Sequence, residues 1–170
     1  MALDHAVVRT DNLYGTDVRA ALISIEYLGA DGQTETAIDN GNVLKVGALK
    51  TGEREIYVGS AVAASDSLED VVLIATPEIV YDSAKRGLDK FYNIAGMPCR
   101  GYYLHSGAVF SVTKEALGGA STPAVGNIVE LDAGTKLKVV ASATSGSTAV
   151  GKIIAIDTVG MYTFYAIRVD

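Results

Sequence analysis

The sequence GNVLKV at residues 41–46 and the sequence GNIVEL at residues 126–131 open two stretches of the chain with nearly the same phrase. Each phrase places a glycine and an asparagine, which favour a turn, before apolar and β-branched residues, which favour a strand. A glycine-containing turn, an extended segment and a stretch of small residues follow each phrase. A second apolar strand comes next, at residues 71–75 in the first case and 153–156 in the second. This order predicts two copies of one small β-unit.

Two copies are too few, and their spacing is too long, for the stacked array of a repeat protein. Two halves that share one core are the simpler interpretation. The chain has 170 residues, of which 49% are hydrophobic, and this fits one globular domain with a sizeable core. We therefore predict a mainly β fold, a β-sandwich or a small β-barrel, in which residues 21–170 form a single β-rich domain.

Residues 1–20 are predicted to form an N-terminal arm. Residues 11–15 have turn chemistry, and the segment has few apolar side chains at either regular period. Besides the segments already named, residue composition and alternation predict strands at residues 20–28, 55–58, 102–112 and 162–169. The last of these carries large side chains on both faces, so we expect both faces to be covered.

One short helix is predicted at about residues 83–95. Ser83 can cap its N-terminus, and the sequence GMP at residues 96–98 supplies its end. Three apolar side chains fall at positions i, i+3 and i+4 on one face of this helix: Leu88, Phe91 and Tyr92. We expect the helix to pack across a sheet. Single helical turns are also predicted within residues 65–70 and 113–117.

Charge and hydropathy exclude several classes of partner. The formal charge is −6, and the 14 Lys and Arg residues are scattered along the chain. A protein that binds nucleic acid needs a basic stripe to neutralise phosphates, and an anionic membrane surface also selects clustered basic residues. No apolar run approaches the length of a membrane span, and residues 1–20 carry charges where a secretory signal would be apolar. We predict no direct nucleic-acid partner and no membrane partner.

The residues that suggest chemistry do not form a site. The sequence GSTAVGK at residues 146–152 has the spacing of a phosphate-binding loop, but Ile153 follows where a hydroxyl should hold magnesium, and the next residues favour a strand. Cys99 is the only cysteine, which excludes an internal disulfide, and we interpret it as buried rather than reactive. The two histidines, His5 and His105, lack the spacing of a metal site. We predict no catalytic residue, no cofactor and no metal ligand.

Tyrosine is unusually abundant, since nine of the twelve aromatic residues are Tyr. Tyrosine suits surfaces that become buried on association, because it combines a large ring with a polar tip. The possible interface residues are Tyr14, Tyr102, Tyr103, Tyr162 and Tyr165. The alternative, that these rings only cover the faces of a sheet, stays open at this point.

Four groups of residues follow one another in an order that resembles the structural proteins of tailed bacteriophages. They are IDNGNV at residues 38–43, VLIATPE at residues 72–78 with Tyr81 and Asp82, GYYLHSG at residues 101–107, and GNIV at residues 126–129 leading to TKLKVV at residues 135–140. The resemblance covers roughly residues 37–169. Within that group, the chain is most similar to the small head proteins that decorate an icosahedral capsid, and the arm falls outside the resemblance.

The resemblance implies a mechanical function without a reaction. Decoration proteins bind the outside of the assembled capsid and bridge neighbouring major capsid subunits, so the expected partner is the major capsid protein. The resemblance also implies a homo-oligomer, with a trimer favoured, in which the tyrosine-rich faces form the subunit interface. The expected location is the exterior of the virion capsid, after synthesis in the cytoplasm of the host bacterium. A polar arm is expected to become ordered only on the capsid.

Two other functions remain open from the sequence. One is a head-fibre base or tail-associated module that binds host surface glycans, with exposed Tyr rings as a stacking platform. The other is a small hydrolase whose Asp or Ser groups only the fold brings together. A major capsid protein is disfavoured, because the chain is short and no long helix is predicted.

Overall fold

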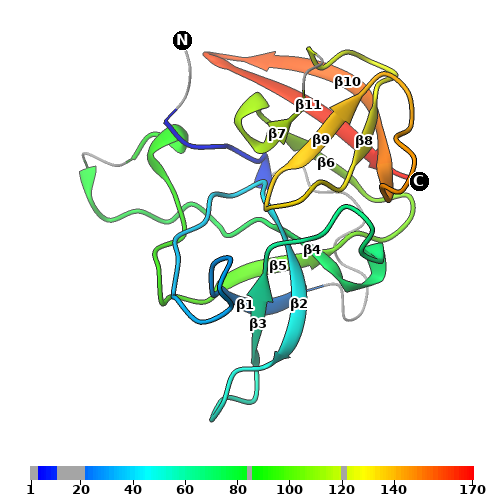
Figure 1. Ribbon diagram of the computed structural model, residues 1–170. Helices are drawn as coiled ribbons and strands as arrows, with labels where there is room; N and C mark the ends of the chain where they lie inside the picture. The colour runs from blue at the N-terminus through cyan, green and yellow to red at the C-terminus, as the bar shows by residue number, and fades with distance from the viewer. Residues whose placement is uncertain (1–3, 11–21, 84–85, 120–121) are drawn as a thin grey trace.

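The computed structural model describes residues 4–10, 22–83, 86–119 and 122–170, and β-strands form most of its regular structure (Figure 1). The first half contributes β1 (Leu22–Tyr27), β2 (Val43–Leu49), β3 (Ile56–Ser60), β4 (Val71–Ile74) and β5 (Cys99–Tyr103). The second half contributes β6 (Val109–Val112), β7 (Leu117–Gly118), β8 (Ile128–Glu130), β9 (Leu137–Val140), β10 (Ala149–Val159) and β11 (Tyr162–Val169). Three short 3₁₀ turns accompany them: η2 (Leu68–Asp70), η4 (Leu88–Lys90) and η5 (Lys114–Ala116). The predicted mainly β fold is confirmed.

The first five strands form a closed barrel in the order β1-β3-β2-β4-β5, which we call unit 1. β1 pairs in parallel with β3, whereas the other neighbours in this barrel are antiparallel. The antiparallel pairing of β5 with β1 closes the barrel. Closure leaves this sheet without an exposed edge.

The remaining six strands, which we call unit 2, repeat the same set of pairings. β7 is parallel to β9, β9 is antiparallel to β8, β8 to β10, and β10 to β11. β11 then pairs antiparallel with β6, as β5 pairs with β1. The β6 and β7 strands, interrupted by η5, therefore together take the place that the single strand β1 has in unit 1. This correspondence confirms the prediction of two related β-units.

The two Gly-Asn phrases make the same turn in the two units. Gly41 and Gly126 both have positive φ values, 84° and 89°, which glycine adopts without steric cost. The Gly41 N–H donates to the Ile74 carbonyl at 2.7 Å, and the Ile74 N–H donates to the Asn42 carbonyl at 2.8 Å. In unit 2, Gly126 and Asn127 make the same two bonds with Ile153, at 2.8 and 3.0 Å. Each phrase thus fixes the start of a central strand against its neighbour.

The apolar run at residues 71–75 explains how the units pack. Alternate side chains of β4 point to opposite faces, and all four of its residues are buried. Val72 and Ile74 lie in the interior cluster of the unit 1 barrel. Val71 and Leu73 belong instead to a larger cluster that includes residues of β6 to β11. One core therefore runs from the outer face of unit 1 into unit 2, as expected for a strand that is apolar without interruption.

The described part of the predicted N-terminal arm packs against the fold. Ala6, Val7 and Val8 are each 1% exposed, and Val8 forms a β-bridge with Val112 of β6. The Thr113 N–H donates to the Val7 carbonyl at 2.8 Å. Residues 4–10 thus add an extended segment to unit 2. Residues 11–20, and with them Tyr14, lie outside the described residues.

The helix predicted at residues 83–95 is wrong over the part of that range that the structure describes. Residues 86–95 contain only the 3₁₀ turn η4, and Gly87 precedes it in an extended conformation. The backbone N–H and C=O groups of Asn93 pair with Ile38, at 2.8 and 3.0 Å, in place of groups four residues away. Tertiary pairing has therefore overridden a helical apolar period. The segment at 102–112 also differs from the prediction, because β5 and β6 are two strands that belong to different units.

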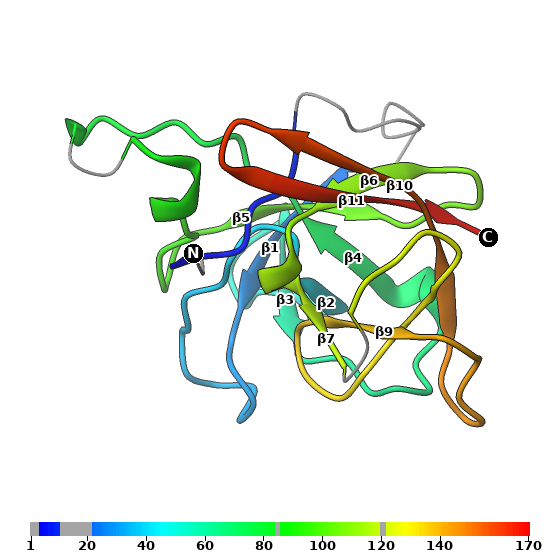
Figure 2. The ribbon, with the colours of Figure 1, turned by 90° about the horizontal axis from the view of Figure 1, so that it is seen from above.

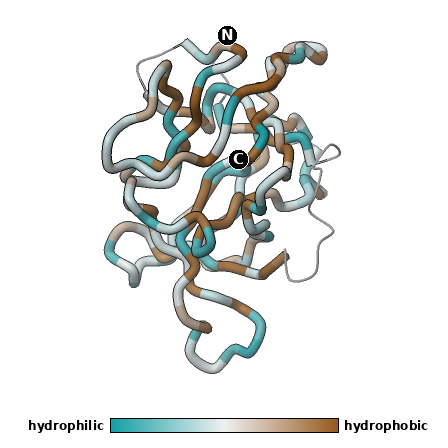
Figure 3. The backbone as a smooth tube through the Cα atoms, turned by 90° about the vertical axis from the view of Figure 1, so that its right-hand side faces the viewer, coloured by the Kyte–Doolittle hydropathy of each residue, from teal (hydrophilic) through white to brown (hydrophobic). Residues whose placement is uncertain are grey.

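The connections between strands differ in character. The β2–β3 connection at the bottom of the molecule is largely hydrophilic, whereas apolar segments run through the interior of the molecule (Figure 3). The segment between β4 and β5 extends away from both sheets in two perpendicular views (Figures 1 and 2). Among the described residues, no helix is long and apolar enough to cross a membrane.

Candidate interaction surface

Large apolar side chains that remain exposed gather in two places. One is the segment at residues 75–98 between β4 and β5, which we call the 75–98 loop. The other is the outer part of the β10–β11 hairpin at residues 154–165, which we call the β10–β11 arm. Nine of the twelve exposed large hydrophobic residues of the described chain belong to these two segments: Ile79, Tyr81, Leu88, Ile94, Met97, Ile154, Ile156, Val159 and Met161. The two segments are equivalent, because each connects the fourth and fifth strand positions of its unit.

Buried amide side chains fix the base of the 75–98 loop. Asn40 is 1% exposed, and its side chain donates to the Thr76 carbonyl at 2.7 Å and accepts from the Thr76 N–H at 3.0 Å. The Asn93 side chain donates to the Asn40 Oδ1 at 3.1 Å. Buried amides that satisfy each other in this way hold a backbone in one course. The loop therefore presents its apolar side chains from an anchored base.

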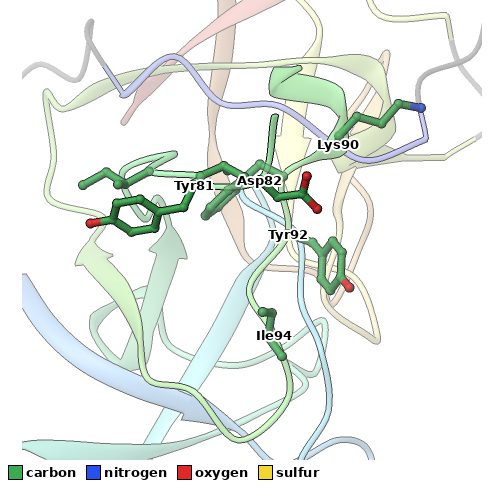
Figure 4. A pocket seen from close by; sticks show the side chains of 8 residues that line it. Tyr81, Asp82, Lys90, Tyr92 and Ile94 are labelled. Atoms are coloured by element: carbon green, nitrogen blue, oxygen red, sulfur yellow. The ribbon is translucent and has the colours of Figure 1, made fainter. Parts of the chain in front are cut away.

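A cavity of about 270 Å³ lies within the loop (Figure 4). Its lining is mainly apolar and aromatic and comes from residues 79–82 on one side and 90–94 on the other. The side chains of Tyr81 and Tyr92 point in opposite directions, and Lys90 extends towards the N-terminal segment. Tyr81 is 94% exposed, the highest value among the exposed large apolar residues of the described chain. Exposed aromatic rings of this kind are typical of interaction surfaces.

The N-terminal segment holds the loop from one side. The His5 ring stacks on the Tyr92 ring with centroids 5.0 Å apart, and its Nδ1 lies 3.0 Å from the Asp39 Oδ1. Asp4 and Lys90 form an ion pair. The hydrogen bond from the Lys90 ammonium lowers the pKa of the Asp4 carboxyl below its usual value. These contacts join the start of the chain to the loop.

The β10–β11 arm meets the same region from the other unit. The Tyr162 hydroxyl donates to the Asp89 Oδ1 of the loop at 3.2 Å. Burial, followed by the nearby Asp89 carboxylate, raises the pKa of Tyr162. The Arg9 guanidinium lies over the Phe164 ring, 5.8 Å from its centroid. A second cavity of about 460 Å³ lies between the N-terminal segment, the loop and the arm. The two apolar segments therefore lie next to one another.

The four predicted tyrosines that the structure describes occupy more buried positions than Tyr81. Tyr102 and Tyr165 are partly buried and pack against the core that joins the two units, whereas Tyr103 packs against the interior of the unit 1 barrel. Burial is also the main cause that raises the pKa of Tyr103. Tyr162 is partly buried beside Phe164 and Asp89. Tyr162 and Tyr165 both belong to the β10–β11 arm, and Tyr162 also bonds to Asp89 of the 75–98 loop.

Local sequence patterns did not identify Ile79 and Ile94 as exposed apolar residues of the loop. The signal that could have revealed them is the sequence EIVY at residues 78–81, which directly follows Pro77. An apolar run next to a proline cannot continue β4, so its side chains leave the sheet.

The structure describes the surroundings of several groups that suggested chemistry in the sequence. Cys99 is 3% exposed, its Sγ lies 3.0 Å from the Ile25 carbonyl oxygen, and burial raises the pKa of its thiol to about 12. A thiol with such a pKa is not a nucleophile at neutral pH. Within the sequence at 146–152, a turn at Gly146 leads into β10, which already contains residues 149–152. No group of three or more potential metal ligands lies together in the described ranges.

An ion pair with a buried carboxylate, Glu26 with Lys50, lies in unit 1. Glu26 of β1 is 1% exposed, and both of its carboxylate oxygens accept hydrogen bonds from the Lys50 Nζ, at 2.7 and 2.8 Å. The hydrogen bond to Glu26 raises the pKa of Lys50. Such a pair satisfies a carboxylate that would otherwise be costly to bury. Lys50 Nζ also lies 3.8 Å from the Glu35 Oε1, and the Glu35 carboxylate packs against Gly96 of the 75–98 loop.

Comparison with known proteins adds no relative. No protein-family model, no curated protein and no solved structure matches the chain.

Proposed function

We propose that this protein is a virion structural protein of a tailed phage that binds the outside of the assembled capsid and bridges neighbouring major capsid subunits. The proposal rests on the resemblance of residues 37–169 to capsid decoration proteins. The observation that supports a binding role is the apolar surface of the 75–98 loop, where Ile79, Tyr81, Ile94 and Met97 are each more than 60% exposed. Exposed apolar groups that gather on an anchored segment mark a protein interaction site.

The mode of action that fits this surface is mechanical. Burial of apolar area against a capsid subunit contributes roughly 25 cal/mol per Å² before the costs of association. Each copy contributes modestly, but many copies that bind only the assembled lattice stabilise the lattice against its opening. The partner is the major capsid protein, and the site of action is the exterior of the virion.

Co-sedimentation with undecorated capsids tests this proposal. Purified protein is mixed with capsids that lack decoration, and the pellet is examined by electron microscopy. We expect stoichiometric density on the outer lattice. The double variant Ile79→Ser/Ile94→Ser should lose most of this binding. Leu49→Ser, which alters an exposed apolar side chain at the end of β2, serves as the matched control and should bind as the original protein does.

A glycan-binding module at the head fibre or tail is a second candidate, favoured by Tyr81. Its exposed ring lies beside the apolar cavity of the loop, an arrangement that suits stacking against a sugar ring. A glycan array with the isolated protein tests this candidate. Binding to a sugar that Tyr81→Ala abolishes, together with an absence of density on the capsid lattice, would replace the decoration proposal by this one.

A further inference from the structure

The outer half of β10 has an unpaired edge. β8 pairs with Ala149, Gly151 and Lys152 of β10, and the Ile153 backbone bonds to Asn127. After a β-bulge between Ile153 and Ala155, residues 155–159 of β10 pair with β11 on one side, and no backbone hydrogen bond from the described residues reaches their other side. In a strand, alternate N–H and C=O groups point to each side. This side therefore offers a row of donors and acceptors that no backbone group of the described residues satisfies.

Apart from the β-bulge between Ile153 and Ala155, where it begins, this edge carries few of the devices that protect edge strands. Proteins usually block such edges with lysine, proline or inward charges. Residues 154–159 read Ile-Ala-Ile-Asp-Thr-Val, with one charge and neither lysine nor proline. None of these six residues is buried, and Ile154, Ile156 and Val159 are between 41% and 50% exposed. These residues have a high preference for β-structure, and their apolar side chains are exposed to solvent in a single copy of the chain.

The equivalent position of unit 1 shows no such edge. There β4 ends at Ile74, where the Gly41 turn completes its pairing, and the chain leaves the sheet at Pro77. In unit 2 the Gly126 turn ends the pairing with β8 at Ile153 in the same way, yet β10 continues through a β-bulge and remains paired with β11 to Val159. The extension is thus an addition to the shared architecture of the units and is not needed to complete the second one.

We propose that the 154–158 edge of β10 pairs antiparallel with the same edge of a second copy of this chain. An antiparallel pair of identical edges is self-complementary about a two-fold axis, so the contact closes as a dimer. A register centred on Ile156 places Ile156 opposite Ile156 of the second copy, and Asp157 opposite Ala155. In this register no like charges face one another, and β-branched side chains meet across the pair.

This proposal does not depend on the capsid proposal. It replaces the trimer that the resemblance implies by a dimer built on a continuous sheet. It also assigns self-association and the binding of another partner to two different segments of the apolar surface. The β10–β11 arm carries self-association, and the 75–98 loop remains available to another partner.

The test introduces charged residues of either sign at Ile156, the centre of the proposed contact. Sedimentation equilibrium of the full chain, over a range of protein concentrations, gives the oligomeric state. We expect the original protein to form a dimer, and Ile156→Lys and Ile156→Glu each to be monomeric, because like charges then face each other across the axis. A mixture of the two variants should regain the dimer. Leu49→Lys, a change at a similarly exposed site in unit 1, should leave the dimer intact.

Each contrary result overturns the proposal. A monomeric or trimeric original protein would do so, as would a dimer that persists in Ile156→Lys. Circular dichroism and continued protection of the Cys99 thiol check that the variants are folded. The capsid assay separates the two proposals: a monomeric Ile156→Lys that still binds capsids leaves both intact, whereas failure of the original dimer to bind capsids overturns only the capsid proposal.

Discussion

Unit 1 and unit 2 have the same sequence of strand pairings, but unit 1 is a closed barrel and unit 2 is an open six-stranded sheet. In unit 1 the single strand β1 pairs with both β5 and β3, and the barrel is closed. In unit 2 these roles are divided between β6 and β7, and the η5 turn with buried Ala116 lies between them. The comparison teaches that the pairing scheme tolerates a break in the closing strand, provided that the core beneath the break is filled.

The larger differences lie in the connection between the fourth and fifth strands. Unit 1 uses this connection for the long 75–98 loop, and unit 2 uses it for the extended β10–β11 arm. Both segments carry exposed apolar side chains, and they meet where Tyr162 bonds to Asp89. The shared architecture therefore presents two variable segments side by side. Both proposed interactions, with the capsid and with a second copy, use these segments.

The largest expected effect is the loss of unit 2 packing in Gly151→Ala. By the register of the two Gly-Asn turns, Gly151 takes the place that Val72 has in unit 1. A methyl group at Gly151 would collide with the Arg168 carbonyl oxygen of β11. We expect a loss of about 3 kcal/mol or more in the free energy of unfolding, measured by urea denaturation.

The control for this change is Gly118→Ala in β7. The nearest atom to its methyl group would be the Leu137 carbonyl oxygen at 3.6 Å, an ordinary contact. Its free energy of unfolding should stay within about 0.5 kcal/mol of the original. Equal effects in the two variants would contradict the close approach of β10 and β11.

The substitutions Gly41→Ala and Gly126→Ala, at equivalent turns of the two units, should distinguish the cost of backbone strain from the cost of close packing. Both residues have positive φ, so both substitutions cost about 1 to 2 kcal/mol of backbone strain. Gly41 also lies against unit 2, where a methyl group would approach the Ala116 Cβ to 3.0 Å and the Val112 Cγ1 to 3.2 Å, whereas Gly126 has open space. We expect Gly41→Ala to be the more destabilising by about 1 kcal/mol or more. A larger loss in Gly126→Ala would argue against the shared core.

The buried Cys99 thiol should make the stability of the fold depend on pH. Its folded pKa of about 12 lies above the usual value of 9.0, so the folded state retains a proton that the unfolded state releases. The stability from this group is present below pH 9 and decreases as the pH rises towards 12. Cys99→Ala should remove that part of the pH dependence, as measured by denaturation between pH 8 and 11.

Thiol labelling at neutral pH extends this measurement to cooperativity. Because Val71 and Leu73 of unit 1 belong to the core of unit 2, we expect labelling of Cys99 only through global unfolding. Labelling that is much faster than global unfolding would show that the unit 1 barrel opens by itself.

The smallest expected effect is the change in the free energy of unfolding of Ile79→Ser/Ile94→Ser, the double variant that should lose capsid binding. Ile79 and Ile94 are 70% and 62% exposed, so Ile79→Ser/Ile94→Ser removes little buried area. We expect a change within about 0.5 kcal/mol in the free energy of unfolding. A larger loss would mean that these side chains support the loop, and capsid binding would then have to be tested with Tyr81→Ser instead.

Much of the fold follows from local patterns. The repeated Gly-Asn phrases, the buried run at 71–75 and the alternating C-terminal strand all predicted elements that the structure contains, because turns and strand alternation are encoded by neighbouring residues. The helix at 83–95 failed for the opposite reason. Its apolar period is a local signal, but the backbone of Asn93 pairs with Ile38, far away in the sequence.

The candidate surface was only partly predictable. Tyrosine abundance pointed to interfaces, and Tyr162 does contact the surface formed by the loop and the arm. Composition alone cannot tell a ring that covers a sheet from a ring that extends into solvent, since both occur in strands and loops with the same neighbours. Tyr81, with 94% exposure, differs from Tyr102 and Tyr103 only through its place in the fold.

The sequence by itself determined that this chain is a mainly β protein built from two related units, because glycine turns and β-branched runs act over a few residues. The tertiary structure decided how the units close, since η5 and the split of β6 from β7 depend on the core formed between distant strands. It also decided which apolar residues remain exposed. A side chain on a strand remains exposed when no neighbouring strand or sheet covers it, and pairing between distant parts of the chain decides which strands are covered.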